Sequence, residues 1–480
     1  MSELHPLISG INNSISDELI EPTELSDGRN YMPDRLNRGV LIKRPGLTRE
    51  VTTQLTEAAT SIYEGIEQNY FTTSTAIRRM NAAGTSLTAA LTSTTAPDWT
   101  SLAGRDIYAN GSDAPRRSNG AGAATVVLGG TPPTFKYVEA YNNFVFGAGH
   151  STGVLRWSDV GTIETWTAAN SLTLTNNQND DINGLIKYLD ALFIFCRKSF
   201  YQVRGFATNA ISIVGANYNE GCTSHRSLIV TPFGLFWWSQ AGLAWTRDGI
   251  TISYPTQEKI PNTIERLNRN LYTRVHGVWH PRFECVEMFC FNGSATSENI
   301  AFFFFPRDNS LWIMSGLGTE MSASGMVTAS GVADVYLGSN ITTGYVFKQD
   351  GELDDTTPIA AYAETKRDVT QFGIKAKKRA SILTPMFIAV DTGTIDYGVY
   401  IDNAVSLTKT WTIPISQPAG TFVLGTSLLN TGILGASTEA QEYPIGYDRE
   451  FRKIKHRLGD NSAIRTRIRG MIVEGTLVSA

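Results

Sequence analysis

The amino-acid sequence repeats one short unit, and this repeat constrains the fold more than any other feature. Each unit has an apolar run, a tight polar turn, a second apolar run, a polar break and a third apolar run. Val, Ile, Phe, Tyr and Trp dominate these runs, as half-buried strands require. The clear units span residues 137–149, 184–205, 227–249 and 277–292. The pattern predicts a series of small antiparallel sheets.

The turns between the apolar runs contain residues that tolerate a left-handed backbone. Asn, Asp and Gly adopt a positive φ at little cost, and tight hairpin turns need it. The expected turns lie at Asn142-Asn143, Leu189-Asp190, Phe233-Gly234 and Ala333-Asp334. The run Phe302–Phe305 is apolar throughout, which indicates a strand that is covered on both faces.

Units of three or four strands that recur about every 35–50 residues are typical of a β-propeller. Weaker units at 61–81, 104–120 and 328–351 extend the series. We therefore expect an all-β protein with a propeller of about six or seven blades. A large antiparallel sandwich, whose hairpins look alike, is the alternative that the pattern leaves open.

Both ends of the chain differ from this repeat. The first fifty residues are interrupted by Pro22, Pro33 and Pro45, which predicts an extended arm that lies on another surface. After residue 355 the strands become longer and alternate. We expect residues 51–355 to form the propeller and residues 356–480 to form a smaller antiparallel β platform. Because chain ends often lie close together, the arm, residues 1–50, is expected to pack on that platform.

Composition and charge limit the classes of function. Hydrophobic residues make up 42% and charged residues 18%, so a large core is expected and wholesale disorder is not. The net charge of −4 lacks the basic surplus of proteins that hold nucleic acid by its phosphates. The four cysteines are too few for a disulfide scaffold. With no signal peptide and no apolar run that could span a bilayer, the chain reads as a soluble product of a reducing cytoplasm.

Few residue clusters suggest metal or catalytic chemistry. His276, His280, Cys285 and Cys290 are of the types that bind zinc, but their spacing matches no common finger and they read as ordinary strand residues. In residues 156–166 an Asp-box-like turn has the wrong spacing, so it supports a propeller and not glycoside cleavage. The usual hydrolase, metalloprotease and P-loop motifs are absent. We expect no catalytic residue, no bound metal and no cofactor.

The C-terminal part of the chain carries two strongly basic strands. Cations at alternate positions of a strand project from one face, where they repel each other unless solvent, an acidic partner or a phosphate neutralises them. Two interpretations remain open: a solvated sheet face, and a face that docks an acidic partner, with DNA as the weaker candidate. The candidate docking residues are Arg452, Lys453, Lys455, Arg457, Arg465, Arg467 and Arg469.

Four segments spread over the chain resemble one known family. Residues 44–50, with the turn Arg44-Pro45-Gly46, resemble the turn that closes the N-terminal arm of that family. The other segments are residues 198–207, 382–402 and 449–480. In this order they are similar to the tail nozzle proteins of short-tailed bacteriophages, also called tail accessory or stabilisation proteins.

The resemblance implies a structural virion protein that catalyses no reaction. It would form a homo-hexamer below the portal and the adaptor (the head-to-tail connector), with the platform and the arm docked upward. The propellers would line the lower channel, through which double-stranded DNA passes without specific binding. Tail spikes or fibres would attach outside, and a needle or plug protein could close the tip. The subunit would belong to the virion tail and to the host cytoplasm during assembly, with no direct membrane span.

Two other functions suit a propeller. A virion-associated glycosidase acting on surface polysaccharide would need two carboxylates at a defined separation, so it predicts a carboxylate cluster at the mouth of the propeller. A peptide-binding scaffold predicts regular Trp-Asp blade signatures, which the sequence lacks.

Overall fold

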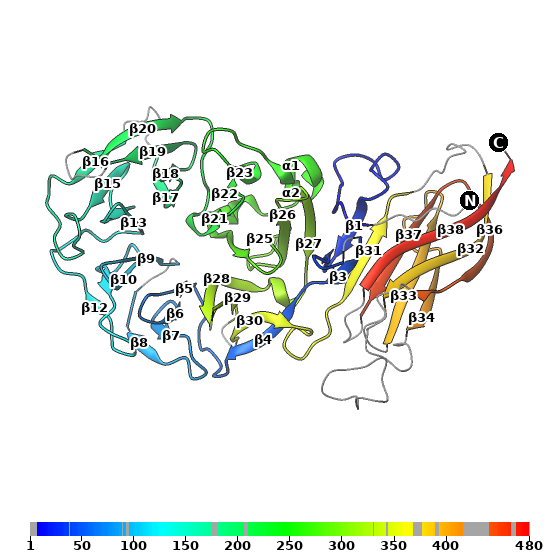
Figure 1. The fold of residues 1–480 in the computed structure, drawn as a ribbon, viewed down its shortest axis with the longest axis horizontal. Helices are drawn as coiled ribbons and strands as arrows, with labels where there is room; N and C mark the ends of the chain where they lie inside the picture. The colour runs from blue at the N-terminus through cyan, green and yellow to red at the C-terminus, as the bar shows by residue number, and fades with distance from the viewer. Residues whose placement is uncertain are drawn as a thin grey trace.

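The molecule has a ring-shaped body and an elongated β body beside it (Figure 1). Its structure, a computed structural model, covers most of the chain. The described residues are 7–37, 39–88, 90–92, 96–174, 180–205, 210–329, 331–341, 344–367, 377–388, 393–415, 441–461 and 467–479.

Seven small antiparallel sheets form the ring, so the expected propeller is confirmed, with seven blades. Blade 1 has β5 (Ser61–Glu64), β6 (Asn69–Thr72), β7 (Ile77–Arg79) and β8 (Ser86–Thr88). Blade 2 has β9 (Asp98–Leu102), β10 (Arg105–Ala109), β11 (Arg116–Arg117) and β12 (Val126–Val127). Blade 3 has β13 (Tyr137–Tyr141), β14 (Phe144–Ala148), β15 (Val154–Trp157) and β16 (Ser171–Thr173). Blade 4 has β17 (Ile182–Tyr188), β18 (Ala191–Cys196), β19 (Phe200–Arg204) and β20 (Ser212–Asn217).

The remaining blades complete the ring. Blade 5 has β21 (Ile229–Thr231), β22 (Gly234–Ser239) and β23 (Gly242–Thr246), followed by the short helices α1 (Pro255–Lys259) and α2 (Pro261–Glu265). Blade 6 has β24 (His276–His280), β25 (Cys285–Cys290), β26 (Ile300–Phe305) and β27 (Ser310–Met314). Blade 7 has β28 (Met321–Ala329), β29 (Val332–Ser339), β30 (Val346–Gly351) and β4 (Gly46–Val51). Single turns of 3-10 helix lie at His225–Ser227, Arg269–Arg274 and Leu317–Thr319.

The outer strand of blade 7 comes from the N-terminal side of the chain. Strand β4 pairs with β30, with Val51 opposite Val346 and Arg49 opposite Phe347. This corrects the expected boundary, because residues 46–51 belong to the propeller and not to an arm on the platform. The pairing satisfies the edge of β30, which would otherwise present unpaired backbone groups. Contact between β28 and β5 then closes the ring.

Most of the expected turns are present. Asn142, Asn143 and Leu189 have φ of 49°, 65° and 52°, and each lies between two paired strands. The expected turn at Ala333-Asp334 is wrong, because both residues lie inside β29. The chain reverses just before them, where Gly331 has a φ of 81° and nothing would crowd a side chain. All four residues of Phe302–Phe305 are buried in β26, as their apolar run predicts.

The elongated body is a platform of two packed sheets. One sheet has the order β1 (Leu25–Arg29), β31 (Ala361–Thr365), β37 (Ile454–Asp460), β33 (Gly393–Ile401) and β34 (Lys409–Ile415). The other has the order β2 (Tyr31–Pro33), β3 (Leu41–Lys43), β38 (Arg467–Ser479), β32 (Lys377–Ile388) and β35 (Gln441–Glu442), with β36 (Ile445–Phe451) also on β32. Trp411 of the first sheet meets Tyr447 of the second with ring centroids 5.5 Å apart.

The N-terminal segment is built into this platform. Strand β1 pairs with β31 in one sheet, and β3 pairs with β38 in the other. Strands β1 and β2 also contact β27, the outer strand of blade 6. One buried apolar cluster runs from blades 5 to 7 into both platform sheets. The described part of the N-terminal segment therefore joins the platform to the propeller.

Candidate functional site

The Arg44-Pro45-Gly46 turn lies between β3 of the platform and β4 of the propeller. Only 3% of Arg44 is exposed, and its guanidinium donates to both carboxylate oxygens of Asp354, at 2.8 and 2.5 Å, and to Asn30 Oδ1 at 3.1 Å. A Cβ on Gly46 would lie 2.2 Å from the Leu353 carbonyl oxygen, so only glycine fits. The turn is a buried junction between the two bodies.

The residue before this turn makes a second buried ion pair. Lys43 Nζ lies 2.9 Å from Asp460 Oδ2, and the two side chains are 2% and 0% exposed. Burial lowers the pKa of Lys43, because desolvation disfavours the charged form. Two consecutive cations thus bind carboxylates of the platform and of the segment after blade 7. Such pairs need exact geometry to offset their desolvation. Lys43 therefore fixes how the two platform sheets pack, and Arg44 fixes how the platform meets the propeller.

The basic strand β37 is largely neutralised by carboxylates of the same chain. Lys455 lies 2.8 Å from Glu364 and 3.4 Å from Asp17, and Lys453 lies 2.9 Å from Glu18. Arg457 lies 3.5 Å from Glu364 and above the ring of Tyr362. Asp17 and Glu18 come from the N-terminal segment. The acidic partner of these three cations is therefore in part the arm itself.

The other candidate docking cations have different surroundings. Arg467 lies 3.7 Å from Asp34. Ile468 is buried and Arg469 is exposed, so successive side chains of this part of the strand face opposite sides, as expected. Arg452 is exposed, and only its backbone groups are bonded, to Asp402 and Lys378. Among the described residues, no carboxylate pairs with Arg452 or Arg469. Arg465 lies outside the described residues.

The histidines and cysteines of blade 6 form no metal centre. His276 is bonded through both ring nitrogens, to Ser324 Oγ and to the Met321 carbonyl, each at 2.8 Å. His280 packs on Phe283, and burial lowers its pKa to about 3. Cys285 and Cys290 are buried free thiols. Within the described ranges, no group of three or more His, Cys, Asp or Glu side chains could hold a metal ion.

The axis of the propeller holds a small cavity of about 210 Å³, lined by residues from six blades and from the segment His225–Leu228 that precedes blade 5. Arg226 ties the blades around it by donating to the carbonyls of Thr60, Ser322 and Arg274, at 3.1, 2.6 and 2.7 Å. His225 Nε2 lies 2.7 Å from Asp98. Glu139 faces the cavity, and burial, together with the charge of Asp98, raises its pKa to about 8.

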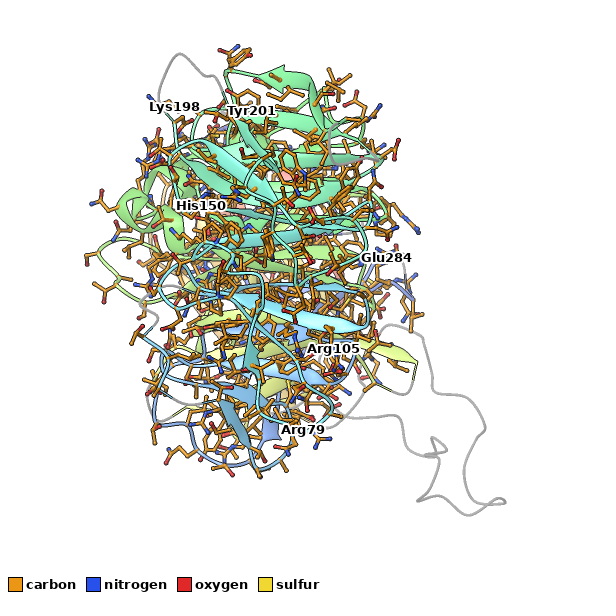
Figure 2. The ribbon with its side chains drawn as sticks, turned by 90° about the vertical axis from the view of Figure 1, so that its left-hand side faces the viewer. Arg79, Arg105, His150, Lys198, Tyr201 and Glu284 are labelled. Atoms are coloured by element: carbon orange, nitrogen blue, oxygen red, sulfur yellow. The ribbon has the colours of Figure 1, made fainter. Side chains whose placement is uncertain are left out.

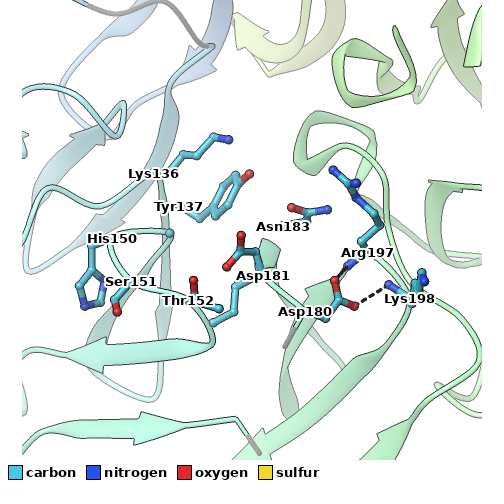
Figure 3. Close-up of a pocket in the computed structure, with 12 residues that line it drawn as sticks. Lys136, Tyr137, His150, Ser151, Thr152, Asp180, Asp181, Asn183, Arg197 and Lys198 are labelled. Atoms are coloured by element: carbon cyan, nitrogen blue, oxygen red, sulfur yellow. Dashed lines mark hydrogen bonds between the residues drawn. The ribbon is translucent and has the colours of Figure 1, made fainter. Parts of the chain in front are cut away.

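A larger pocket of about 640 Å³ lies between blades 3 and 4 (Figure 3). Figure 2 shows His150 and Lys198, from its lining, toward one side of the propeller, and Arg105 and Glu284 toward the opposite side. The lining residues are Lys136, Tyr137, Gly149, His150, Ser151, Thr152, Asp180, Asp181, Ile182, Asn183, Arg197 and Lys198.

The carboxylates of these cavities mostly hold the backbone. Asp98 accepts from the Val138 amide at 2.7 Å as well as facing His225. Asp180 accepts from the amides of Arg197 and Lys198, at 3.2 and 2.8 Å. Both groups are thus engaged in positioning loops.

Sequence reasoning missed both cavities. Several polar residues of the larger pocket lie where the chain enters the innermost strands of successive blades, with Lys136-Tyr137 at the start of β13 and Asp180-Asp181 just before β17. Charged residues at equivalent positions of two neighbouring repeats would have indicated the larger pocket. The uneven length of the repeats conceals that alignment.

Comparisons with known proteins give little further information. Scans against protein-family models and against curated protein sequences found no match. Among solved structures, the chain is similar to one described as YCF48 bound to D1 peptide, with 9% identity, a TM-score of 0.38, and coverage of 64% of this chain and 97% of that chain. A likeness at this level supports no conclusion about function, and the propeller assignment rests on the sheet topology. No helix in the described part of the chain is long and apolar enough to cross a membrane.

Proposed function

We propose that the chain is a structural subunit of the tail nozzle of a short-tailed bacteriophage, acting as a homo-hexamer below the portal and adaptor. The observation that carries the proposal is the junction at Lys43 and Arg44. The buried ion pair of Arg44 with Asp354 and one continuous apolar cluster hold the platform on the propeller, while Lys43 and Asp460 join the two platform sheets beside it. A ring subunit that bears load needs such a fixed angle, whereas a hinged pair of domains would not hold a channel open.

The narrow axis of the propeller favours a channel that is formed by a ring of subunits. Its cavity of about 210 Å³ is far too small for a DNA duplex, and Arg226 crosslinks the blades around it. DNA would therefore pass between the copies of a hexamer and not through a single propeller. A net charge of −4 suits that role, because a wall rich in Lys and Arg would hold the phosphates and slow the passage of DNA.

In this proposal the platform is the part of the subunit that docks to the adaptor. Arg452 and Arg469 are its exposed candidate cations, and an acidic adaptor surface would neutralise them. Tail spikes or fibres would attach to the outside of the ring, and a needle or plug protein would close its tip. In this proposal the subunit acts in the virion tail, is assembled in the host cytoplasm and catalyses no reaction.

Retention of packaged DNA tests this proposal. Purified heads that carry portal and adaptor would be incubated with and without the chain, and nuclease-sensitive DNA would be measured over time. A nozzle seals the head, so the chain should reduce DNA release, at about six copies for each head. If release is unchanged while the chain remains folded and unbound, the proposal is wrong.

A further inference from the structure

The pocket between blades 3 and 4 contains two cations that form no ion pair with the described residues. Lys136 comes from the segment before β13 and Arg197 from the turn after β18. No carboxylate of the described residues lies within ion-pair distance of either side chain. Figure 3 shows Lys136 and Tyr137 on one side of the pocket and Asn183 and Arg197 on the other, with Asp181 between them. Cations that line a cavity without an ion-pair partner attract an anion.

The walls of the pocket are held in place without a ligand. Asp180 accepts from two backbone amides of the turn that carries Arg197. The stem of Lys136 packs so closely on Gly149 that a Cβ there would lie 2.6 Å from Lys136 Cβ. Asn183 donates to the Cys222 carbonyl at 3.2 Å. A preformed pocket of about 640 Å³ lies within the usual range for small-molecule sites, about 300–1,000 Å³.

We propose that this pocket binds a carboxylated saccharide, such as a uronate unit of an acidic polysaccharide. Lys136 and Arg197 would bind the carboxylate through charge-assisted hydrogen bonds. Ser151, Thr152 and Asn183 offer the hydroxyl and amide groups that recognise several sugar hydroxyls, and Asp181 accepts from hydroxyl donors. The inference is independent of the nozzle proposal, because it requires only binding to one propeller.

The lining disfavours a phosphate or a nucleotide. Asp181 is an exposed carboxylate within the pocket, which would repel a doubly charged group more than a single carboxylate. Only 7% of Tyr137 is exposed and its ring is covered by Lys136 and His225, so it offers no open face on which a base could stack. A ligand with one negative charge and many hydroxyls fits both observations.

Isothermal titration calorimetry on the full chain tests the proposal with three probes: α-1,4-linked digalacturonate, its neutral counterpart α-1,4-linked digalactose, and inorganic phosphate. The test variant is Lys136→Met with Arg197→Gln, which keeps the side-chain stems and the backbone bonds to Asp180. The control variant is Arg204→Gln, an exposed arginine of the same blade outside the pocket.

Digalacturonate should bind the wild type and the control variant more tightly than digalactose or phosphate does, and added salt should weaken it. The double variant should weaken digalacturonate binding by about tenfold or more, since two charge-assisted contacts are lost. Three results would overturn the proposal: no binding of digalacturonate to the folded wild type, equal binding to the double variant, or phosphate binding as tight as that of digalacturonate.

Discussion

Arg44 and Asp354 are separated by 310 positions in the sequence, and they form a two-point ion pair at the place where the platform meets the propeller. The same guanidinium also donates to Asn30 of the platform. One side chain therefore connects the N-terminal segment, which is built into the platform, with the segment that leaves blade 7. This relationship explains why the short turn at Arg44-Pro45-Gly46 stands out in an otherwise irregular N-terminal segment.

Replacing Arg44 should destabilise the junction strongly. Arg44→Ala leaves Asp354 buried without its cation, which costs about 3–5 kcal/mol in the free energy of unfolding. Arg49 provides a matched control, because it pairs with the adjacent Asp355 while 39% of its side chain is exposed. Arg49→Ala should cost about 0–1 kcal/mol. Urea denaturation of both variants measures the difference, and equal costs would contradict the assigned role of Arg44.

A buried acid between blades 6 and 7 should make stability depend on pH. Burial raises the pKa of Glu287 from its ordinary value of 4.5 to about 8, and among the described residues Gln349 alone is hydrogen-bonded to its side chain, at 3.2 Å. Its contribution to stability is therefore fully present below pH 4.5 and is lost as the pH rises toward 8. In that window, folding keeps a proton that the unfolded chain releases, which lowers stability by about 1.4 kcal/mol for each pH unit.

Glu287→Gln should remove this loss, because an amide resembles the protonated acid in size and remains neutral. Relative to wild type, the variant should gain stability steadily from pH 5 to pH 8. Thermal unfolding at several pH values measures the gain. Glu265→Gln, at an exposed site on α2, controls for the substitution itself. A constant difference between variant and wild type across this range would refute the prediction.

The two lysines of the basic strand should differ in their effect on folding. Lys455 is 9% exposed and pairs with Glu364 and Asp17, whereas Lys453 has one ion-pair partner among the described residues, Glu18. Lys455→Met leaves the buried Glu364 with a weaker set of partners and should cost about 3 kcal/mol. Lys453→Met should cost about 1 kcal/mol or less. Equal midpoints of chemical denaturation for the two variants would argue against this ranking.

The exposed cations should matter for docking and not for folding. Arg452→Glu with Arg469→Glu reverses two charges whose side chains have no ion-pair partner among the described residues. The double variant should keep the unfolding midpoint of the wild type and lose binding to adaptor-bearing heads in a sedimentation assay. Arg204→Glu, a charge reversal on the propeller, is the control and should bind normally. Normal binding by the folded double variant would exclude these cations as the docking contacts.

The sequence predicted the fold more fully than the site. Strand periodicity and turn residues such as Asn142 and Asn143 act locally, so the blades could be inferred from neighbouring positions alone. Strand β4 could not be assigned this way, because its place in blade 7 depends on pairing with β30, almost 300 residues later in the chain. The same holds for Arg44, whose carboxylate partner is equally distant.

The basic strand shows a different limit of sequence reasoning. Its charges indicated an acidic partner, and for Lys453 and Lys455 carboxylates of the arm and of β31 already supply one. A run of cations in a sequence indicates that a counter-charge is needed. It does not indicate whether that counter-charge lies in the same chain or in a partner. The pocket between blades 3 and 4 was missed for a related reason, since its residues come together only when two blades pack side by side.

Electron microscopy distinguishes a nozzle subunit from a protein that does not join the phage tail. Heads that carry portal and adaptor would be imaged with and without the purified chain. The nozzle account predicts a new six-fold density below the adaptor, with each subunit showing a seven-bladed ring joined at a fixed angle to a β platform. Unchanged heads, with the chain free and folded in solution, would contradict it.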